Sequence, residues 1–355
     1  MPILKTDTLI VGAGLSGLHT TAKLHAMGQE VTLIEARSRL GGRIMSHTVG
    51  NASFDLGPTW FWPGQPHMDR IIDEFSLRTF PQQSEGIALY EDENGRIQSM
   101  RDSPMEGAYR IEGGMGAIIS ALANRIPAER IQLNSTATHL RRTSAGIETS
   151  LRCDGHTQTI RSQRVILALP PRLVAALSFE PALPTTLITS LREIPTWMAG
   201  HAKLLAFYDT PFWRTTGYSG EAFSQRGPLI EIHDASPKSG GPYALFGFVG
   251  TPPDQRKALE ERLVEEILEQ LQGLFGATAR HPTASHLQDW AQDSYTATKR
   301  DLTPLNYHPS YGYFSGTFDL LDGAILLSGT ETAEQYGGFI EGALDASMRT
   351  IHKFS

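Results

Sequence analysis

Residues 8–36 read TLIVGAGLSGLHTTAKLHAMGQEVTLIEA, and this stretch decides the fold. Its pattern predicts a strand over 8–11, a helix from about Leu15 to Met27 and a second strand over 31–34. The first strand and the helix are joined by G-x-G-x-x-G, and Glu35 follows the second strand. A glycine turn and an acidic residue at this spacing are typical of a dinucleotide-binding βαβ unit. The stretch therefore predicts a Rossmann-type domain.

The three glycines of the turn have different physical roles. Gly12 permits the tight turn, Gly14 lets the backbone approach a pyrophosphate, and Gly17 lets the helix pack closely on the strand. The free N–H groups at the helix N-terminus favour phosphate binding. The carboxylate of Glu35 can accept hydrogen bonds from an adenosine ribose. From this unit we expect cofactor contacts by Gly12, Ala13, Gly14, Ser16, Gly17, Glu35, Ala36 and Arg37.

The bulk properties narrow the class of protein. The length of 355 residues is sufficient for two domains, and the formal net charge of −7 argues against a nucleic-acid partner. No signal-like N-terminus or long apolar run is present, so we expect a soluble, cytoplasmic protein without membrane contact. The single cysteine, Cys153, fits a reducing compartment, and its place in a hairpin turn predicts a surface thiol. The 12 histidines form no metal-binding pattern, so we expect no metal site.

Two further segments identify the cofactor. Residues 35–44 read EARSRLGGRI and residues 54–63 read FDLGPTWFWP. Both segments resemble the flavin-containing amine oxidase family, which has an E-x-x-x-x-x-G-G-R signature and a D-x-G-x-x-W-like stretch beyond it. The resemblance implies that FAD is held by the arginine of G-G-R and by the loop after it. The corresponding residues of this chain are Gly42, Arg43, Gly57, Pro58, Thr59 and Trp60.

The C-terminal segment 325–347 reads ILLSGTETAEQYGGFIEGALDAS and is similar to the closing motif of the same family. The resemblance implies contacts of Thr330 and Glu331 with the ribityl and phosphate part of FAD. It also implies a helix N-terminus at the flavin pyrimidine, where the helix dipole favours negative charge. This helix start consists of Gly338, Phe339 and Ile340, and the family further implies cofactor contacts by Ala137, Trp290 and Gly329.

Lys203 lies in an apolar strand within HAKLLAFYDTPFW, residues 201–213. A strand lysine usually extends its ammonium group to a surface edge. The segment nevertheless resembles the family strand in which an active-site lysine stands eight residues before a Pro-Phe-Trp sequence, here beginning at Pro211. In that family the lysine holds a water molecule against flavin N5. A cation beside N5 would stabilise developing negative charge in a dry pocket.

Two positions depart from the family pattern. Lys299 stands where some members bind FAD covalently through a cysteine, so we expect non-covalent FAD. The two tyrosine positions of the family's aromatic cage are Arg300 and Phe339 in this chain. Either Arg300 faces an anionic group of the substrate, or it points away, and a plain surface arginine is equally open. In the second case the other wall would come from Tyr295, Tyr307 or Trp60.

These observations predict a two-domain α/β protein. We expect a discontinuous FAD-binding domain over 1–75, 111–190 and 291–355, and a smaller α+β substrate domain over 76–110 and 191–290. The reduced segment 76–110 leaves the site either more open or completed by a second subunit, as in a homodimer.

The resemblance implies an amine oxidase that transfers hydride from the amine α-carbon to flavin N5, with O2 regenerating the flavin and forming hydrogen peroxide. The implied catalytic residues are Lys203, Trp60, Phe339 and Arg300. A desaturase, dehydrogenase or isomerase of the same fold that does not use O2 is the alternative. A non-catalytic flavoprotein would give Lys203 no reason to keep its spacing.

Overall fold

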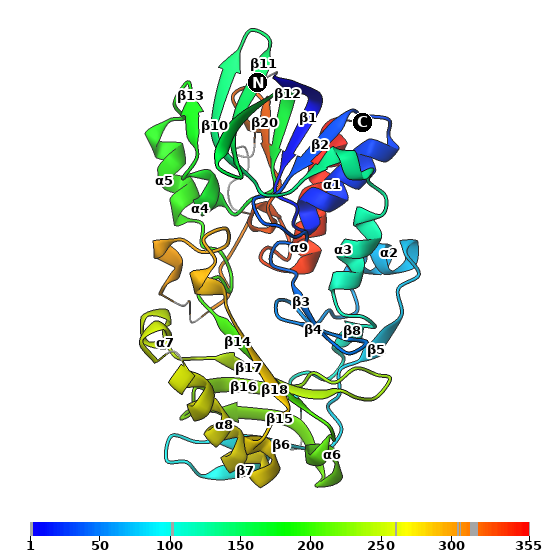
Figure 1. Cartoon of the computed structure of the whole chain (residues 1–355), viewed down its shortest axis with the longest axis vertical. Helices are drawn as coiled ribbons and strands as arrows, with labels where there is room; N and C mark the ends of the chain where they lie inside the picture. The colour runs from blue at the N-terminus through cyan, green and yellow to red at the C-terminus, as the bar shows by residue number, and fades with distance from the viewer. Residues whose placement is uncertain are drawn as a thin grey trace.

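The computed structural model describes residues 3–100, 103–259, 261–303, 305, 307–312 and 319–354. The molecule is elongated, with a large sheet at one end and a second sheet at the other (Figure 1). Both chain ends lie beside the larger sheet. The predicted fold class, a Rossmann-type unit combined with a second α+β part, is confirmed.

The larger sheet contains the predicted βαβ unit. Strands β1 and β2 pair in parallel, and helix α1 runs between them in the chain. The strand order is β13-β10-β11-β12-β1-β2-β9, with β20 paired to β12 and β19 paired to β20. The bounds are β1 (Leu4–Val11), β2 (Val31–Ile34), β9 (Ile131–Gln132), β10 (Ser135–Thr143), β11 (Gly146–Cys153), β12 (His156–Leu167), β13 (Ser178–Glu180), β19 (Asp319–Leu320) and β20 (Ile325–Leu327).

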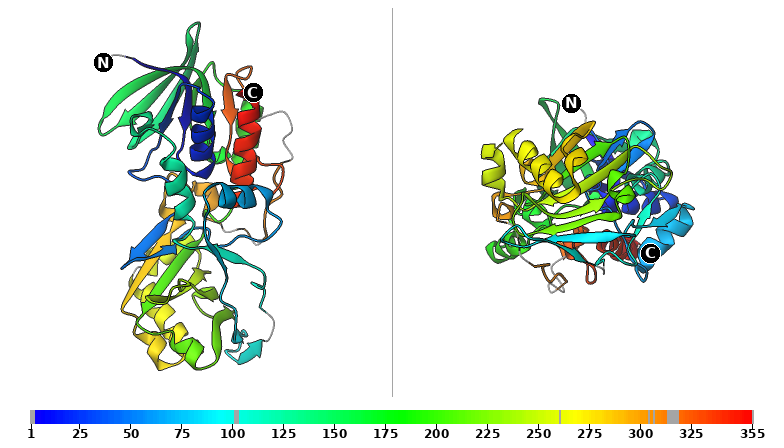
Figure 2. Two further views of the ribbon diagram at one scale, coloured as in Figure 1. Left: turned by 90° about the vertical axis from the view of Figure 1, so that its right-hand side faces the viewer. Right: turned by 90° about the horizontal axis from the view of Figure 1, so that it is seen from below.

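Helices cover both faces of this sheet. Alternating β1 residues divide between two cores, with Ile10 in one core and Leu9 in the other. Figure 2 shows α1 and α9 side by side against the first face, where α2 and α3 also pack. Helices α4 and α5 belong to the second face. The bounds are α1 (Leu15–Ala26), α2 (Pro66–Glu74), α3 (Gly116–Ala123), α4 (Pro171–Val174), α5 (Thr185–Glu193) and α9 (Ile340–Ile351).

The second sheet has the strand order β18-β14-β17-β16-β15-β6-β7. All its strand pairs are antiparallel except β15 with β6. The bounds are β6 (Ile87–Glu91), β7 (Ile97–Met100), β14 (Ala202–Tyr208), β15 (Tyr218–Ser224), β16 (Leu229–Asp234), β17 (Tyr243–Val249) and β18 (Ala284–Asp289). These strands fall within the segments that we propose as the substrate domain.

The two faces of the second sheet have different neighbours. Leu204 and Ala206 of β14 pack with the apolar stripe of α8 (Glu261–Phe275). Because strand side chains alternate, Lys203, Leu205 and Phe207 lie on the opposite face. On that face Leu205 and Phe207 pack against Phe54 of a neighbouring hairpin. Strand alternation therefore directs Lys203 away from the helix-covered core.

Short elements complete the fold. Two short antiparallel pairs, β3 with β4 and β5 with β8, lie between the sheets (Figure 1). They comprise β3 (Ser46–Val49), β4 (Ala52–Asp55), β5 (Thr79–Pro81) and β8 (Tyr109–Ile111), and the remaining α-helices are α6 (Phe212–Thr215) and α7 (Pro253–Leu259). Short 3-10 helices occupy Ala128–Arg130, Ala277–Arg280, Trp290–Gln292, Lys299–Asp301, Thr330–Thr332 and His352–Phe354. Among the described residues, no helix has the length and apolar character needed to cross a membrane.

The surface thiol predicted at Cys153 is wrong. Cys153 ends β11 beside the hairpin turn, opposite His156 of β12, but its side chain is buried. Strand alternation puts the thiol on the same face as Leu151, which packs in the core beneath the sheet. The turn is exposed, whereas the residue that precedes it points inward.

Candidate active site

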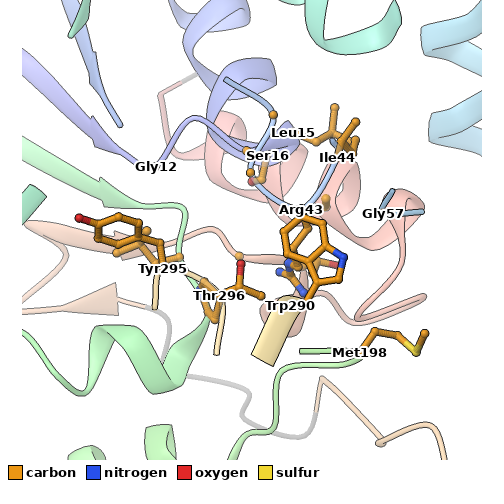
Figure 3. A pocket seen from close by; sticks show the side chains of 18 of the residues that line it. Gly12, Leu15, Ser16, Arg43, Ile44, Gly57, Met198, Trp290, Tyr295 and Thr296 are labelled. Atoms are coloured by element: carbon orange, nitrogen blue, oxygen red, sulfur yellow. The ribbon is translucent and has the colours of Figure 1, made fainter. Parts of the chain in front are cut away.

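A cavity of about 670 Å³ lies between the start of α1 and the second sheet. Figure 3 shows Leu15 and Ser16 at the helix start, and Arg43, Gly57 and Trp290 around the same pocket. The cavity also reaches Lys203 on β14, so both predicted parts of the site share one space. The predicted residues that line it are Gly12, Gly14, Ser16, Glu35, Ala36, Arg37, Gly42, Arg43, Gly57, Pro58, Thr59, Trp60, Ala137, Trp290, Lys203, Gly329, Thr330, Gly338, Phe339 and Ile340.

The N-terminus of α1 meets the cavity without a side-chain cap. Gly14 is the N-cap residue, and no side chain accepts from the first-turn N–H groups at this position. These groups remain available for an anion. Gly17 lies outside the lining and has a packing role, because a Cβ atom there would come within 1.9 Å of the Gly12 carbonyl oxygen. Ala13 is also outside the lining, and its N–H donates to Oε2 of Glu35 over 2.8 Å.

Glu35 and Arg37 form one end of the cavity. The buried Glu35 accepts the backbone N–H of Arg37 at Oε1 over 2.9 Å. The Arg37 guanidinium pairs with Asp293, donates to Thr296 and lies 5.4 Å from the centre of the Tyr295 ring. Tyr295 therefore lies at the Glu35 end of the cavity and is not a wall beside Lys203. No sequence motif marks Asp293 or Thr296, although both follow Trp290 closely.

Arg43 and Glu331 form an ion pair in which the Glu331 side chain is fully buried and that of Arg43 is 27% exposed. Nη1 of Arg43 donates to Oε1 of Glu331 over 2.6 Å. Burial acts to lower the pKa of Arg43, but the Glu331 charge and hydrogen bond raise it overall. Glu331 lies behind Arg43, outside the cavity lining, and its Oε2 is buried without a hydrogen-bond partner. Nearby, Trp290 donates its indole N–H to the Leu56 carbonyl oxygen over 3.1 Å.

The N-terminus of α9 also meets the cavity. Phe339 is its N-cap residue and makes no side-chain cap hydrogen bond. The hydroxyl of Thr330 donates to the Phe339 carbonyl oxygen over 2.8 Å and accepts from the Gly338 N–H over 3.0 Å. The Phe339 ring stacks on His308 with centroids 4.7 Å apart. Thr330 thus holds the chain that leads into the helix.

These features fit a dinucleotide with a charged, polar middle and a ring system at one end. Two uncapped helix N-termini face one cavity, and Glu35 lies at its far end. The phosphates of FAD would lie at α1, the adenosine ribose at Glu35 and the flavin at α9.

Lys203 is buried, with 2% of its surface exposed. Its Nζ donates to Oγ1 of Thr59 over 2.6 Å and to the Gly57 carbonyl oxygen over 3.2 Å. The ammonium group also lies 3.9 Å from the centre of the Phe246 ring. The surface-edge alternative for this lysine is therefore excluded. Both hydrogen-bond partners of Lys203 belong to the loop that the family resemblance singled out.

Two opposing effects determine the pKa of Lys203. Burial lowers its pKa to about 7, and the Asp55 carboxylate partly offsets this effect. Burial likewise raises the pKa of Asp55 to about 6, with the charges of Lys203 and Arg110 opposing the rise. Asp55 also accepts the Met115 N–H and the Ser46 hydroxyl. The site therefore has an ammonium group that can change protonation state near neutral pH.

Arg300 lies outside the cavity. Its guanidinium pairs with Glu193 over 2.9 Å, and both side chains are more than half exposed. A capping box between Thr298 and Asp301 folds this segment so that Asp301 is buried and Arg300 faces outward. The structure thus favours the surface alternative, and we do not assign Arg300 to the site. Tyr307 is 72% exposed and also lies outside the lining.

The lining near Lys203 is largely aromatic. Of the three residues considered for the second wall, Trp60 lies there, with its ring 6.2 Å from that of Phe248. Within the described chain, Glu35 and Glu231 are the acidic residues of the lining, and Glu231 belongs to the Lys203 end. Sequence reasoning missed Glu231 because no motif marks it. It also missed Trp62, Trp197, Met198, His201 and Phe248, although His201 stands only two residues before Lys203.

Comparisons with known proteins agree with this geometry. A family model described as flavin containing amine oxidoreductase matches residues 97–350, and a model of an NAD(P)-binding Rossmann-like domain matches residues 10–75. Similar proteins include a probable flavin-containing monoamine oxidase A of Dictyostelium discoideum, 23% identical, with 97% of this chain and 96% of that protein covered. Putrescine oxidase of Kocuria rosea is 22% identical, with coverages of 82% and 84%.

Solved structures show the same fold. A redesigned putrescine oxidase superposes with a TM-score of 0.84 at 22% identity, and 99% of each chain is covered. Cyclohexylamine oxidase from Brevibacterium oxydans IH-35A superposes with a TM-score of 0.82 at 18% identity, and 98% of each chain is covered. Since the amine oxidoreductase model matches well over half of the residues, this chain belongs to the flavin-containing amine oxidoreductase family.

Proposed function

We propose that the protein is an FAD-dependent amine oxidase that uses O2 and forms hydrogen peroxide. The residues around the starts of α1 and α9 and around Glu35 form what we call the dinucleotide cradle. The observation that supports the proposal most directly is that one cavity joins this cradle to Lys203. When bound, FAD supplies the acceptor for the electrons that leave the carbon–hydrogen bond next to the amine nitrogen. The imine that results hydrolyses in water. The protein contributes binding, orientation and a dry environment.

We propose that FAD binds without a covalent bond. Lys299, at the position of the family's attachment cysteine, is not part of the cavity lining. The single cysteine, Cys153, is buried at the end of β11 and is also outside the lining. Acid precipitation of the yellow protein should release FAD to the supernatant. Flavin that stays with the pellet would contradict this proposal.

The residues around Lys203 have three tasks. Trp60, Trp197 and Phe248 provide apolar walls that exclude water and hold an amine by its hydrocarbon part and by cation–π contact. Glu231 attracts the ammonium form of the substrate. Lys203 donates hydrogen bonds from a buried position, where a positive charge stabilises developing negative charge. Phe339, at the start of α9, completes the wall on the cofactor side.

The decisive test is anaerobic mixing of the purified holoenzyme with monoamines, diamines and amino acids while the visible flavin absorbance is recorded. Bleaching by an amine, followed by recovery of colour and formation of peroxide on admission of air, is the expected result. Bleaching without recovery in air would reject O2 as the acceptor. No bleaching by any amine would favour the alternative of a desaturase or isomerase acting on carbon–carbon bonds.

The rate of the anaerobic step should rise with pH, because the neutral amine is the form that is oxidised and free amines are mostly protonated at pH 7. A flat profile in single-turnover experiments would count against the proposal. A homodimer and a cytoplasmic location stay predictions, and sedimentation of the holoenzyme tests the first of these.

A further inference from the structure

Two rows of side chains cross the cavity-facing surface of the second sheet. Lys203 lies opposite Phe248, and Phe248 lies opposite Glu231. In the next row Phe246 lies opposite His233, and the antiparallel register of β15 and β16 places Glu221 beside His233. Strand alternation therefore puts Glu231, His233 and Glu221 on one face, at the end of the cavity that contains Lys203.

The three polar residues form a chain from the cavity into the core. Oε1 of Glu231 lies 2.6 Å from Nε2 of His233, a hydrogen-bond contact. Nδ1 of His233 lies 3.3 Å from Oε1 of Glu221, which is an ion-pair distance without hydrogen-bond geometry. The side chains of His233 and Glu221 are fully buried, whereas that of Glu231 is 33% exposed. Ser103 donates its hydroxyl to Oε1 of Glu221 over 2.8 Å. The edge of the Trp60 ring packs on His233 with centroids 4.9 Å apart.

This arrangement favours a positive charge at its centre. A buried carboxylate such as Glu221 is costly unless a cation or several donors satisfy it, and its Oε2 has no hydrogen-bond partner. Burial by itself would lower the pKa of His233, but its contacts with Glu221 and Glu231 raise it overall. An imidazolium between two carboxylates leaves a net charge of minus one, which Glu231 presents to the cavity.

We propose that His233 is a positioning residue: packed between Glu221 and Glu231, it keeps the Glu231 carboxylate directed at the ammonium group of the substrate. Glu221 supplies the second negative charge, so that the group as a whole attracts a cation. We call the part of the cavity around Lys203 the substrate chamber. The inference rests on the proposed function, because it takes this chamber as the site that binds the amine. It assigns roles to two buried residues that do not line the cavity.

The charged groups near His233 define the expected behaviour. In the described chain these are Glu221 on β15 and Glu231 on its own strand. Lys203 on β14 contacts Phe246, which packs on His233, and its charge interacts with that of Glu231. In Glu221→Gln the group becomes neutral while its shape is kept. In His233→Gln the two carboxylates lose their shared cation, and Glu231 loses the contact that directs it.

The test compares binding of choline with that of its neutral isostere 3,3-dimethylbutan-1-ol to the holoenzyme, measured by calorimetry. We expect wild-type protein to prefer choline, and both variants to bind choline about tenfold more weakly. The neutral alcohol should change by less than about twofold. His19→Gln is the matched control, since His19 is a buried histidine whose pKa is lowered to about 4.

Several outcomes overturn the inference. Wild-type protein that binds both ligands equally well would show that Glu231 is no cation site. Variants that keep the wild-type ratio would show that His233 is only a packed histidine. If His233→Gln does not fold, nitrogen-15 histidine NMR of wild-type and Glu221→Gln protein decides, since an imidazolium signal that persists above pH 7 in the wild type should be lost in the variant.

A different set of results would reject the proposed function. Intact flavin bleaching by amines together with a lost preference for choline in wild-type protein would reject this inference alone. Absence of bleaching with every amine would reject the amine oxidase proposal, whatever the choline preference.

Discussion

The dinucleotide cradle and the substrate chamber are built in different ways. The cradle takes its largest group of neighbouring residues from the stretch 12–43, and further residues come from 57–60, Ala137, Trp290 and the start of α9. The chamber takes Lys203, Glu231 and Phe248 from three strands that are neighbours only in the folded sheet. A cradle of this kind depends on a few close backbone contacts, whereas the chamber depends on strand register. Substitutions in the cradle and in the chamber should therefore affect different properties of the protein.

The largest effect is expected from Gly17→Val in the cradle. A Cβ atom at this position would come within 1.9 Å of the Gly12 carbonyl oxygen, so the helix and the glycine turn could not keep their packing. We expect a loss of at least about 3 kcal/mol in the free energy of unfolding together with loss of flavin. Urea unfolding and the flavin-to-protein absorbance ratio measure both.

Gly273→Ala is the control for this variant. Gly273 lies in α8, and a Cβ atom there would have nothing within 4 Å. We expect unchanged flavin content and a stability gain of up to about 1 kcal/mol. Equal behaviour of the two variants would show that the close approach at Gly17 is not what the cradle depends on.

Lys203→Met should disable the chamber and leave the cradle intact. The variant removes the buried ammonium group that donates to Thr59 and Gly57. We expect turnover of a substrate amine to fall about 10²-fold while the flavin content stays unchanged. Stopped-flow measurement of the anaerobic and oxygen-dependent steps shows which of them is slowed. Lys238→Met, at an exposed lysine paired with Glu112, should change neither, and loss of flavin in Lys203→Met would contradict the proposed separation.

The same lysine predicts a pH dependence of stability. Its pKa is about 7 in the folded protein and about 10.5 when unfolded, so between these values the unfolded chain binds more protons. The stability of wild-type protein relative to Lys203→Met should therefore increase as pH rises from 7 toward 10.5, by at most about 1.4 kcal/mol per pH unit. Urea midpoints of both proteins at pH 7, 8 and 9 test this, and a difference that is constant with pH would refute it.

The smallest effect is expected from Arg300→Ala. The Arg300–Glu193 pair is exposed on both sides, and such pairs contribute little to stability. We expect a change within about 0.5 kcal/mol and the same order of preference among amine substrates. A changed substrate preference would return Arg300 to the site and would show that the surface pair opens in solution.

Sequence reasoning succeeded where function depends on local spacing. The predicted helix from about Leu15 to Met27 is α1, Leu15–Ala26, and the predicted cofactor residues almost all line one cavity. Lys203 was found through its spacing to Pro211. Lys203 lies on β14, and Pro211 lies in the turn that follows this strand. Such features can be predicted from the sequence because residues that are close in the chain have few possible arrangements relative to one another.

It failed where position depends on folding of a segment or on pairing between strands. The family resemblance put Arg300 and Phe339 at the two cage positions and left a surface arginine equally open, and the Thr298–Asp301 capping box turns Arg300 outward. Nothing in the sequence around Glu231 or His233 marks them, because their importance comes from the register of β14 to β17. The residues that surround a substrate come from distant segments, so their chemistry appears only when the sheet is assembled.

The amino-acid sequence by itself therefore determined the dinucleotide cradle, the identity of the family and the strand that contains Lys203. Only the tertiary structure decided that Lys203 is buried, that Glu231 shares its chamber and that Arg300 does not. The physical reason is that backbone turns and helix starts are set by a few adjacent residues, while burial and electrostatic environment are set by what packs against a side chain from elsewhere in the chain.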